Sequence, residues 1–574
     1  QPAVKSLFPH VDFEFRHPEE TLIVVGDRHV VVAGRDRWDP AQSTAQTKNG
    51  TVVGKQFEYG TVNAVYCFLQ DQLGVRWFWP GESGEDVVRS DRVVVAPMER
   101  RYHPQIRSRS GVLHYSALGS KGYGKSHDWT LRQRLQLDSL EMAGAHGFGD
   151  WWDRYHEQHP DIFALQPDGT RSGFPNAHNA KLCMSNPKVW ELWLQDVKAA
   201  LAKNPNLELF NASPNDGWAS GHCVCERCRA WDHPDGEPRV FNWKNRNETR
   251  PALSDRDVTF ANKLGELLKR NYPNKNYRVL MMSYGHSRPV PVEARPADNV
   301  VMSIVANFFG RTGLVDRGST RGNTYREQFE GWAEIVPSML WRPNTGSPAG
   351  WQQGLPDLSV QQTIRDLKDV AAARCEGIFI DAVWEHWAAH GPQYYVMAQL
   401  VWNPQIDAQA VLADYYERAF GPAAAPVREY YEALEKARMK FTAGDGESGV
   451  FSFPKLYTPE LLHDSQARLD RAAAAVPSDS LYARRVAFVR VGYDYTRLTL
   501  DNIRLMSEYW KTKNPAVAAK VQENWSAIQK LVVADPYAIN GGPVRPTTPR
   551  MAGLHPDSPA KKVKAARMIE LDLK

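Results

Sequence analysis

Apolar, strand-like runs alternate with amphipathic helical segments over nearly 300 residues, from about residue 105 to about residue 404. The segment "MSNPKVWELWLQDVKAALAKN" predicts a helix with Asn186 as its N-cap and Pro187 in its first turn. Strands are predicted in "LELFNASPND", "YRVLMMSYG", "NVVMSIVANFF" and "GIFIDAVWEHW". Repeated strand–helix units without a GxGxxG fingerprint in this region favour a (β/α) barrel over a dinucleotide-binding fold.

Different patterns flank this region. The run "TLIVVGDRHVVVAG" predicts two strands around a Gly-Asp turn, followed by a helix that stops at Gly74. After Trp387 the strand patterns fade, and helical patterns begin with "IDAQAVLADYYERAFG". The predicted fold is therefore α/β: a small α/β domain (1–98), a (β/α)8-type barrel (99–404) and a C-terminal helical domain (405–574).

Charge and hydropathy exclude several classes of partner. The 70 basic and 66 acidic residues leave a formal charge of +4, and without a Lys/Arg run we expect no nucleic-acid partner. No stretch of 18 apolar residues is present, so we expect no membrane span. The start at Gln1, without a charged and apolar leader, fits a mature exported protein or a trimmed one. Six cysteines do not exclude the periplasm, and we expect a periplasmic or secreted protein.

Aromatic residues are frequent, with 19 Trp, 22 Tyr and 21 Phe. Many stand beside Asn, Asp, His or Arg, and exposed rings beside hydrogen-bonding groups suit sugars. The alternative for any single Trp is a place in the core. An oligo- or polysaccharide is thus the expected partner, while the oligomeric state stays open.

Polar and aromatic residues directly follow many of the predicted strands. In a barrel these strand ends meet on one rim, where active sites form. We therefore expect substrate contacts there from His114, His146, Asn215, Trp218, Tyr284, His286, Asn307, Trp341, Arg342 and Trp384. The alternative for the histidines is a satisfied place in the core, and Arg342 could simply brace a turn.

Two carboxyl groups are needed to cleave a glycosidic bond, one to protonate the leaving oxygen and one to activate water or to attack. Asp216 and Glu385 each follow a strand and have a Trp nearby, so we expect them to be the catalytic pair. Asp381 is the rival of Glu385. The alternative is that each carboxylate caps a helix or pairs with a local Arg.

The run "GHCVCERC" contains three cysteines in a CxCxxC pattern. The pattern resembles part of a zinc knuckle, but a structural zinc ion needs four ligands. His222 or His233 could complete the set; a local disulfide or free packed thiols are the alternatives. We therefore expect no metal and no other cofactor in the site.

Several runs together resemble one bacterial family. "HPDIFALQPDGTR", "KLCMSNPKVW", "NASPNDGWASGHCVCERCRAWD" and "GPQYYVMAQLVWNP" are similar to a family labelled domain of unknown function 4838, which is grouped with alpha-glucuronidase-type glycoside hydrolases. "GTVNAVYCFLQDQLGVRWFWPGE" resembles the small domain before the barrel in alpha-glucuronidases and beta-N-acetylhexosaminidase relatives. The resemblance implies an exported, carbohydrate-active barrel enzyme, with a carboxylate at Asp216 and an acidic residue near Glu385.

Three functions compete. The first is an exo-acting glycoside hydrolase that releases a terminal sugar, which could be a uronic acid because basic residues cluster in sequence near the rim: Arg107, Arg109, Lys121, Lys125, Arg132 and Arg342. The second is a substrate-assisted N-acetylhexosaminidase that uses Asn215 and Asp216. The third is a carbohydrate-binding protein built on a decayed barrel.

Overall fold

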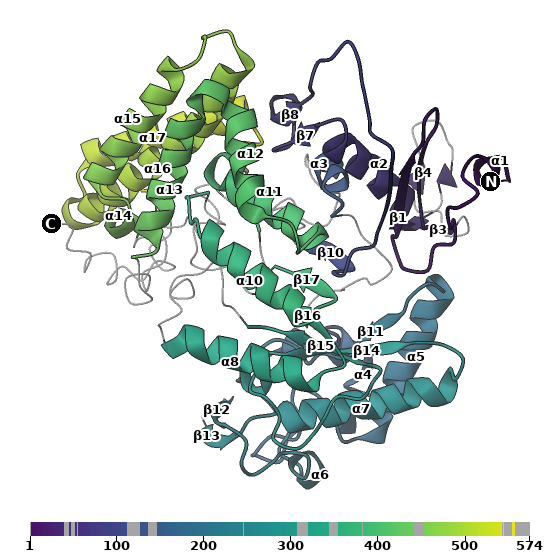
Figure 1. Ribbon diagram of the computed structural model, residues 1–574. Coiled ribbons are helices and arrows are strands. Elements are labelled where there is room, and N and C mark those ends of the chain that lie inside the picture. Colours follow the sequence, from purple (N-terminus) through teal and green to yellow (C-terminus); the bar gives the residue numbers. More distant parts are fainter. Residues whose placement is uncertain are drawn as a thin grey trace.

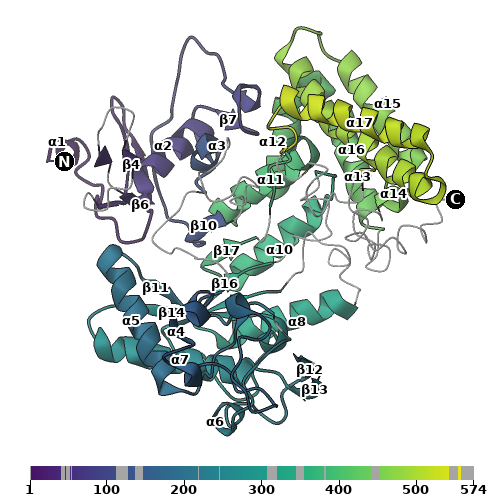
Figure 2. The same cartoon turned by 180° about the vertical axis from the view of Figure 1, so that it is seen from behind.

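The computed structural model describes residues 2–39, 45–46, 52–53, 55–111, 127–135, 146–217, 219–244, 246–306, 320–343, 354–380, 383–440, 453–541, 544 and 554–556. Figure 1 shows three regions: purple N-terminal elements, a mostly teal sheet with its helices, and green-to-yellow helices toward the C-terminus. The view from behind in Figure 2 shows the same three regions.

The N-terminal region combines small antiparallel sheets with two helices, α1 and α2, and it contains the predicted pair of strands around the Gly-Asp turn and the predicted helix before Gly74. Strand β1 pairs with β2 and β9, and the pairing of Val25 with Val30 closes the Gly-Asp turn. Gly74, with a φ of 69°, follows the helix α2. The elements are α1 (Pro2–Leu7), β1 (Thr21–Val25), β2 (Val30–Gly34), β3 (Asp36–Asp39), β4 (Ala45–Gln46), β5 (Val52–Val53), β6 (Lys55–Tyr59), α2 (Gly60–Asp71), β7 (Arg76–Trp77), β8 (Glu85–Asp86) and β9 (Met98–Tyr102).

A parallel sheet of six strands forms the centre. Its order is β10-β17-β16-β15-β14-β11, and all its pairs are parallel. The elements are β10 (Ser108–Gly111), α3 (His127–Arg132), α4 (Trp151–Tyr155), α5 (Pro187–Lys203), β11 (Leu209–Asn211), α6 (Glu226–Arg229), β12 (Pro238–Trp243), β13 (Arg246–Pro251), α7 (Ser254–Asn271), β14 (Arg278–Ser283), β15 (Val300–Ile304), α8 (Thr320–Ile335), β16 (Ser338–Trp341), α10 (Val360–Ala372) and β17 (Gly377–Phe379). The side chain of Asn186 accepts a hydrogen bond from the Lys188 amide (3.0 Å), which confirms the predicted cap of α5.

The strand order is that of a barrel with a gap. Apart from the separate hairpin β12–β13, each strand from β11 to β17 pairs with the next strand of the sheet along the chain, and the last strand, β17, pairs with the first, β10. A doubly wound sheet would instead reverse its strand order at a switch point. Within the described residues β10 and β11 are the two edges, so the sheet is curled and barrel-like. Closure into the full (β/α)8 barrel stays a prediction.

Both faces of the central strands are covered. Every residue of β15 and β16 is buried, as expected for parallel strands between helices and a packed interior. One face meets the helices, with α5 and α7 beside β11 and β14 and with α8 and α10 near β16 and β17 (Figure 1). The other face carries a small separate cluster made of Leu209, Leu280, Val301 and Leu340. This cluster corresponds to a side-chain layer inside a barrel.

A buried ion pair joins the N-terminal region to the sheet. Nη2 of Arg109, on β10, lies 2.5 Å from Oε2 of Glu19, and both side chains are at most 1% exposed. Glu19 also accepts a hydrogen bond from the Asn63 amide on α2 (3.3 Å). Because each buried charge is stable only beside its partner, the pair fixes the N-terminal region against β10.

The C-terminal region is helical, and it includes one helix, α11, that the sequence patterns do not indicate. Helix α11 precedes residue 405, and all of its residues are buried. The helices are α11 (Trp387–Trp402), α12 (Ala408–Phe420), α13 (Ala424–Arg438), α14 (Phe453–Leu456), α15 (Pro459–Ala474), α16 (Leu481–Thr512) and α17 (Pro515–Ala534). Among the described helices, none has the length and apolar character that a membrane-spanning helix needs.

One continuous hydrophobic core runs through the three predicted domains. It includes Val75 near the N-terminus, the outer face of the sheet, and residues of the C-terminal region as far as Leu554. Six tryptophans are less than 2% exposed: Trp79, Trp129, Trp151, Trp332, Trp341 and Trp387. For these six, the core explains the Trp-rich composition better than sugar contacts do. The boundaries near residues 98 and 404 stay a prediction.

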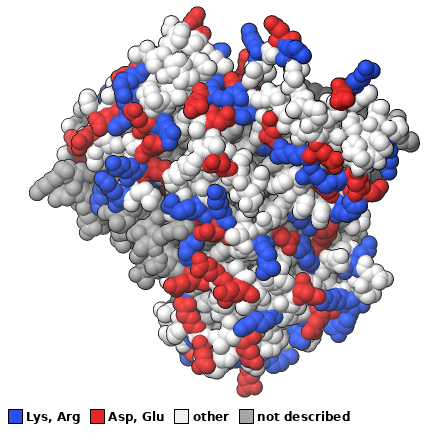
Figure 3. Space-filling model, in the orientation of Figure 1, with Lys and Arg blue, Asp and Glu red and all other residues white. Residues whose placement is uncertain are grey.

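The surface carries both signs of charge. On the face shown in Figure 3, Lys and Arg side chains are interspersed with Asp and Glu. Exposed ion pairs of the molecule include that of Arg428 with Glu432. This mixed face matches the near-neutral balance of the sequence.

A proline inside α11 leaves one carbonyl without its usual donor. Pro392 has no N–H for the carbonyl of Ala388, and the Tyr431 hydroxyl on α13 donates to that carbonyl instead (2.9 Å). Ala388 is fully buried and Tyr431 is 2% exposed. The hydroxyl therefore compensates for the proline in a place that water does not reach.

We predict that Tyr431→Phe lowers the free energy of unfolding by about 1–3 kcal/mol, because it leaves a buried carbonyl without a donor. The midpoint of urea unfolding measures the change. As a control, Tyr509→Phe on α16, where the ring is only partly buried, should change stability by less than about 0.5 kcal/mol. Equal midpoints for Tyr431→Phe and the wild type would contradict the role of the hydroxyl.

Candidate active site at the carboxyl edge of the sheet

Strand alternation decides which side chains of β16 reach the inner face. Leu340 belongs to the inner cluster, so Arg342, two residues later, continues on the same side. Trp341 points the other way: it is fully buried in the outer core, and its indole N–H donates to the Ala306 carbonyl (2.8 Å). Arg342 therefore remains a candidate site residue, whereas Trp341 belongs to the core and the expectation that it contacts substrate is not kept.

Asp216 lies on the loop that leaves the carboxyl end of β11. Its side chain is 54% exposed, and its Oδ1 is 3.9 Å from Nε2 of His146. Nδ1 of His146 donates to the Pro214 carbonyl (2.7 Å), which leaves Nε2 as the proton-accepting nitrogen beside the carboxylate. Burial lowers the pKa of His146, and the charge of Arg342 lowers it further. Two predicted residues thus meet at this edge, with Arg342 within electrostatic range.

Asn215 holds the loop in place instead of facing outward. Its Nδ2 donates to the carbonyls of Phe148 (2.9 Å) and Ala180 (3.0 Å), and its Oδ1 accepts from the Phe148 amide (3.1 Å). The residue is 5% exposed. Its amide group is therefore fully engaged by the protein, and Asn215 positions Asp216.

Lys181 is a further positioning residue, which the sequence analysis missed. Its ammonium group donates to the backbone carbonyls of Asn215 and Asp216, the latter at 2.5 Å. Lys181 is only 4% exposed. Burial lowers its pKa to about 8, against the opposing charges of Asp216 and Asp257. The signal in the sequence was weak, because Lys181 does not follow a predicted strand.

Asp257 on α7 was also missed. It is 3% exposed, and its Oδ1 accepts no hydrogen bond among the described residues. Burial raises the pKa of Asp257 to about 7, although the Ser287 hydroxyl and the charges of Arg256 and Lys181 lower it and that of Asp232 raises it. A buried carboxyl group with this shift, close to a buried lysine, is typical of functional sites.

A small polar cavity lies between these groups. It measures about 20 Å³, room for about one water molecule. The predicted residues Tyr284 and His286 line it together with Lys181 and Asp257. His286 donates to the Val240 carbonyl (2.7 Å), and burial lowers its pKa to about 4. Because the cavity is too small for a sugar, we assign His286 to the support of the site.

Glu385 and Trp384 follow β17, whose carboxyl end lies at the same edge as that of β11. Glu385 is half-buried, and its charge adds to burial in raising the pKa of Tyr394 and Tyr537. Trp384 is 8% exposed, and its carbonyl accepts from the Tyr394 hydroxyl (2.6 Å). Glu385 thus lies within electrostatic range of two tyrosines, just before α11, and three strands separate β17 from β11 in the sheet order.

Four predicted site residues lie outside the described residues and stay predictions: His114, Trp218, Asn307 and Asp381. The same holds for Lys121 and Lys125.

Three of the basic residues that were expected near the rim form ion pairs elsewhere in the molecule. Arg107 pairs with Glu208 at the amino end of β11 (3.5 Å), and Arg109 pairs with Glu19. Arg132 pairs with Glu85 of β8. Closeness in sequence was misleading, because Arg107 lies at the amino end of the sheet, while Arg109 and Arg132 pair with residues of the N-terminal region. Among the described members of the basic set, Arg342 is left as the candidate for an acidic substrate.

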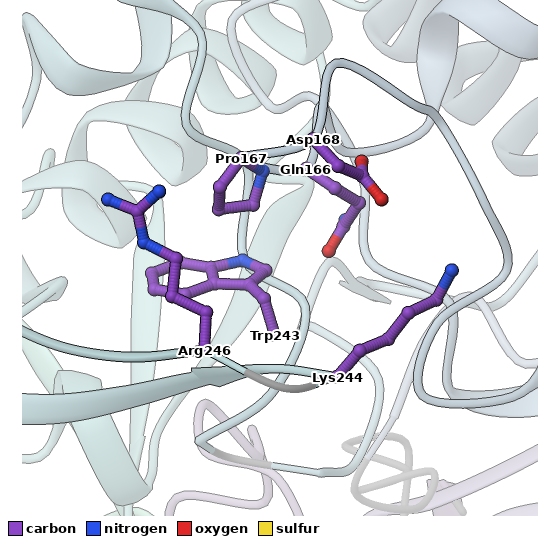
Figure 4. A pocket seen from close by; sticks show the side chains of 6 residues that line it. All are labelled: Gln166, Pro167, Asp168, Trp243, Lys244 and Arg246. Atoms are coloured by element: carbon purple, nitrogen blue, oxygen red, sulfur yellow. The ribbon is translucent and has the colours of Figure 1, made fainter.

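A larger cavity of about 330 Å³ lies beside the hairpin β12–β13 (Figure 4). Trp243 forms its floor, and Lys244, Arg246 and Asp168 extend around it. Trp243 donates to the His222 carbonyl (2.9 Å), the backbone of a residue that lines the small polar cavity. The hairpin was not predicted. Its cavity belongs to a loop and not to the strand edge, so we keep it outside the candidate site.

One further motif is present in the sequence. "GSKGYGKS" at residues 119–126 has the GxxxxGKS spacing of a phosphate-binding loop, but it lies outside the described residues. In such loops the following helix binds the phosphate at its N-terminus. Here the following helix, α3, has only six residues, so we do not include the motif in the site.

The residues that could hold a metal ion are cysteines. Cys183, Cys223, Cys225 and Cys228 place their sulfur atoms within 4.8 Å of one another. The expected fourth partner, His222 or His233, is replaced by Cys183, which lies 40 residues before Cys223 in the chain. The expectation of an incomplete ligand set is therefore wrong.

Comparison with known proteins identifies one family. A family model described as "Domain of unknown function (DUF4838)" matches residues 79–433, which is more than half of the chain. No curated protein matches the chain. A solved structure titled "Structure of CpGH84B" is 10% identical with a TM-score of 0.34; the match covers 97% of this chain and 89% of that one. This likeness is too low to carry an argument about activity.

We predict that Asp257 makes stability depend on pH. Because its pKa is about 7 in the folded chain and about 3.9 when unfolded, the folded state keeps a proton that the unfolded state releases. Below pH 4 the carboxyl group of Asp257 is protonated in both states and does not destabilise the fold. As the pH rises to about 7, only the unfolded state ionises, so the free energy of unfolding falls. Relative to wild type, Asp257→Asn should therefore gain up to roughly 4 kcal/mol between pH 4 and pH 7.

Denaturant unfolding of both proteins across this pH range measures the effect. The matched control is Asp464→Asn on α15, because its side chain is 53% exposed. A constant difference between wild type and Asp257→Asn at every pH would contradict the raised pKa.

Proposed function

Since the chain belongs to the DUF4838 family, whose description assigns no activity, we propose its function from the site itself. The proposal is that this chain is a glycoside hydrolase that releases a terminal sugar from a glycan. The observation that supports this proposal is the exposed carboxylate of Asp216 at the carboxyl edge of the parallel sheet, 3.9 Å from His146. Barrel enzymes carry their catalytic groups at this edge.

The proposed chemistry uses two carboxyl groups. Glu385 is the general acid that protonates the leaving glycosidic oxygen, and Asp216 activates water or attacks the anomeric carbon. Glu385 is half-buried and lies within electrostatic range of two tyrosines, and such acids use partly buried environments. Asp216 is exposed to the substrate side, and the Lys181 ammonium group fixes its backbone. The two groups come from the ends of β17 and β11, on the two sides of the curled sheet.

Arg342 supports an acidic substrate. It follows β16 on the inner face, and its charge acts on His146 beside Asp216. A guanidinium group can hold a sugar carboxylate through two parallel hydrogen bonds. We therefore propose a terminal uronic acid as the released sugar, and an exported location, periplasmic or secreted, where polysaccharides are available.

The hexosaminidase alternative is less well supported. A substrate-assisted mechanism would need Asn215 to contact the acetamido group, but its amide is engaged by Phe148 and Ala180. A binding protein on a decayed barrel remains the non-enzymatic alternative. Binding of a glycan without hydrolysis, unaffected by a change at Asp216, would identify it.

We predict that Asp216→Asn lowers kcat/KM by roughly 10²–10⁴-fold, because the amide neither activates water nor attacks. A panel of aryl glycosides that contains α-glucuronide, α-glucoside and β-N-acetylglucosaminide measures the activity. The matched control is Asp168→Asn, a loop carboxylate of the hairpin cavity, with activity near wild type. Wild-type rates in Asp216→Asn would remove the assignment, and turnover of the N-acetylglucosaminide alone would favour the alternative enzyme.

We predict that Glu385→Gln impairs natural glycans far more than activated aryl glycosides. A general acid is needed most when the leaving group is a poor one, so the ratio of the two rates separates this role from others. Asp381→Asn is the comparison, and we expect it to leave the ratio unchanged. If Asp381→Asn changes the ratio and Glu385→Gln does not, the roles of the two residues are exchanged.

A further inference from the structure

Four cysteines from two distant segments meet beside the candidate site. Cys183 precedes α5, while Cys223, Cys225 and Cys228 belong to the loop before α6 and to α6 itself. All four sulfur atoms lie within 4.8 Å of one another. Cys183, Cys223 and Cys228 are at most 3% exposed. We call this group the four-cysteine cluster.

The sulfur distances are those of metal ligands. Sγ of Cys183 is 3.6 Å from Sγ of Cys225 and 3.8 Å from Sγ of Cys228. Four sulfurs at about 2.3 Å from a central zinc ion would be about 3.8 Å apart at the corners of a tetrahedron. A disulfide needs about 2.05 Å. Because Cys183 has two equally near partners, no single disulfide pairing is favoured.

Hydrogen-bond donors surround the sulfurs. The Leu165 amide donates to Sγ of Cys223 (3.2 Å), and the Cys228 amide donates to Sγ of Cys225 (3.4 Å). The Ser185 hydroxyl lies 3.1 Å from Sγ of Cys228. Donors of this kind orient and stabilise thiolate ligands in metal sites. They give the cluster a second layer of support that packed thiols do not need.

The charge balance also points to a cation. Four thiolates in a buried place would be unstable without positive charge. The guanidinium group of Arg256, which contacts the backbone of the cluster, is already bound to both carboxylate oxygens of Asp232 (2.7 and 2.5 Å) and to the Cys223 carbonyl (2.9 Å). A divalent ion at the centre supplies the missing charge. Four sulfur ligands in a tetrahedron select zinc, or iron, over harder ions.

We propose that the four-cysteine cluster binds one structural zinc ion, which ties the segment 181–185 to the segment 221–228. Four protein ligands leave no open position, so the ion stabilises the fold and takes no part in the reaction. Lys181, two residues before Cys183, holds the carbonyls of Asn215 and Asp216. The zinc ion thus orders the loop that carries Asp216. This proposal does not depend on the proposed activity.

Elemental analysis of the purified full chain tests the proposal. We expect one equivalent of zinc per chain, and its loss in Cys183→Ser and Cys228→Ser. Cys67→Ser and Cys375→Ser are the matched controls, since both residues are buried cysteines outside the cluster; they should keep the full equivalent. A chain without zinc, or with one equivalent of iron in its place, would overturn the assignment.

A second measurement on the unchanged sequence does not depend on whether the variants fold. Exchange of the bound metal for cobalt should give the thiolate-to-cobalt charge-transfer band and the d–d bands of a tetrahedral site. Intact mass under non-reducing, denaturing conditions counts the thiols, and we expect all six cysteines reduced after the metal is removed. A mass that corresponds to disulfides within the cluster would overturn the proposal.

Discussion

Helix α11 is the element on which the rest of the structure depends. It is buried on all sides, and it lies between the sheet and the C-terminal helices (Figure 1). The backbone of α16 comes so close that a side chain at Gly492 would meet the Ala388 carbonyl at 2.9 Å. The same carbonyl receives the Tyr431 hydroxyl. Because Glu385 comes just before this helix, the packing of α11 fixes where that carboxyl group can lie.

Amphipathic helices and short apolar strands such as β15 could be predicted from the sequence, while the fully buried helix α11 could not. Helix α5 has a cap, a proline at its start and a polar face, and all three signals are local. Helix α11 has no polar face, so its residues show no helical periodicity, and Pro392 argues against a helix. Its stability comes from contacts with distant segments. Such contacts are not visible in a local pattern.

The residues of the candidate site were likewise only partly predictable from the sequence. His146 and Asp216, both expected at the rim, lie near each other although they are 70 positions apart in the chain, and His146 follows none of the described strands. The rule that strand ends meet on one edge failed for Trp341, because neighbouring residues of a strand face opposite sides, and Arg342 already occupied the inner one. Lys181, Asp257 and Cys183 were not foreseen since they reach the site from outside the strands. Their roles depend on partners that only the folded chain brings near.

The position of Asp216 therefore depends on three supports that lie in different parts of the chain. The Asn215 amide binds the segment around Phe148 and Ala180, the Lys181 ammonium group binds the loop carbonyls, and the cysteines join the segments on either side. An exposed carboxylate on an unsupported loop would sample many positions, and catalysis requires one. These supports explain why the motif "SPNDG" and the cysteines that follow it stand so close together. Under the proposed function, the cysteines would hold the loop of the site, and the proposed chemistry would belong to Asp216, which lies between them and β11 in the chain.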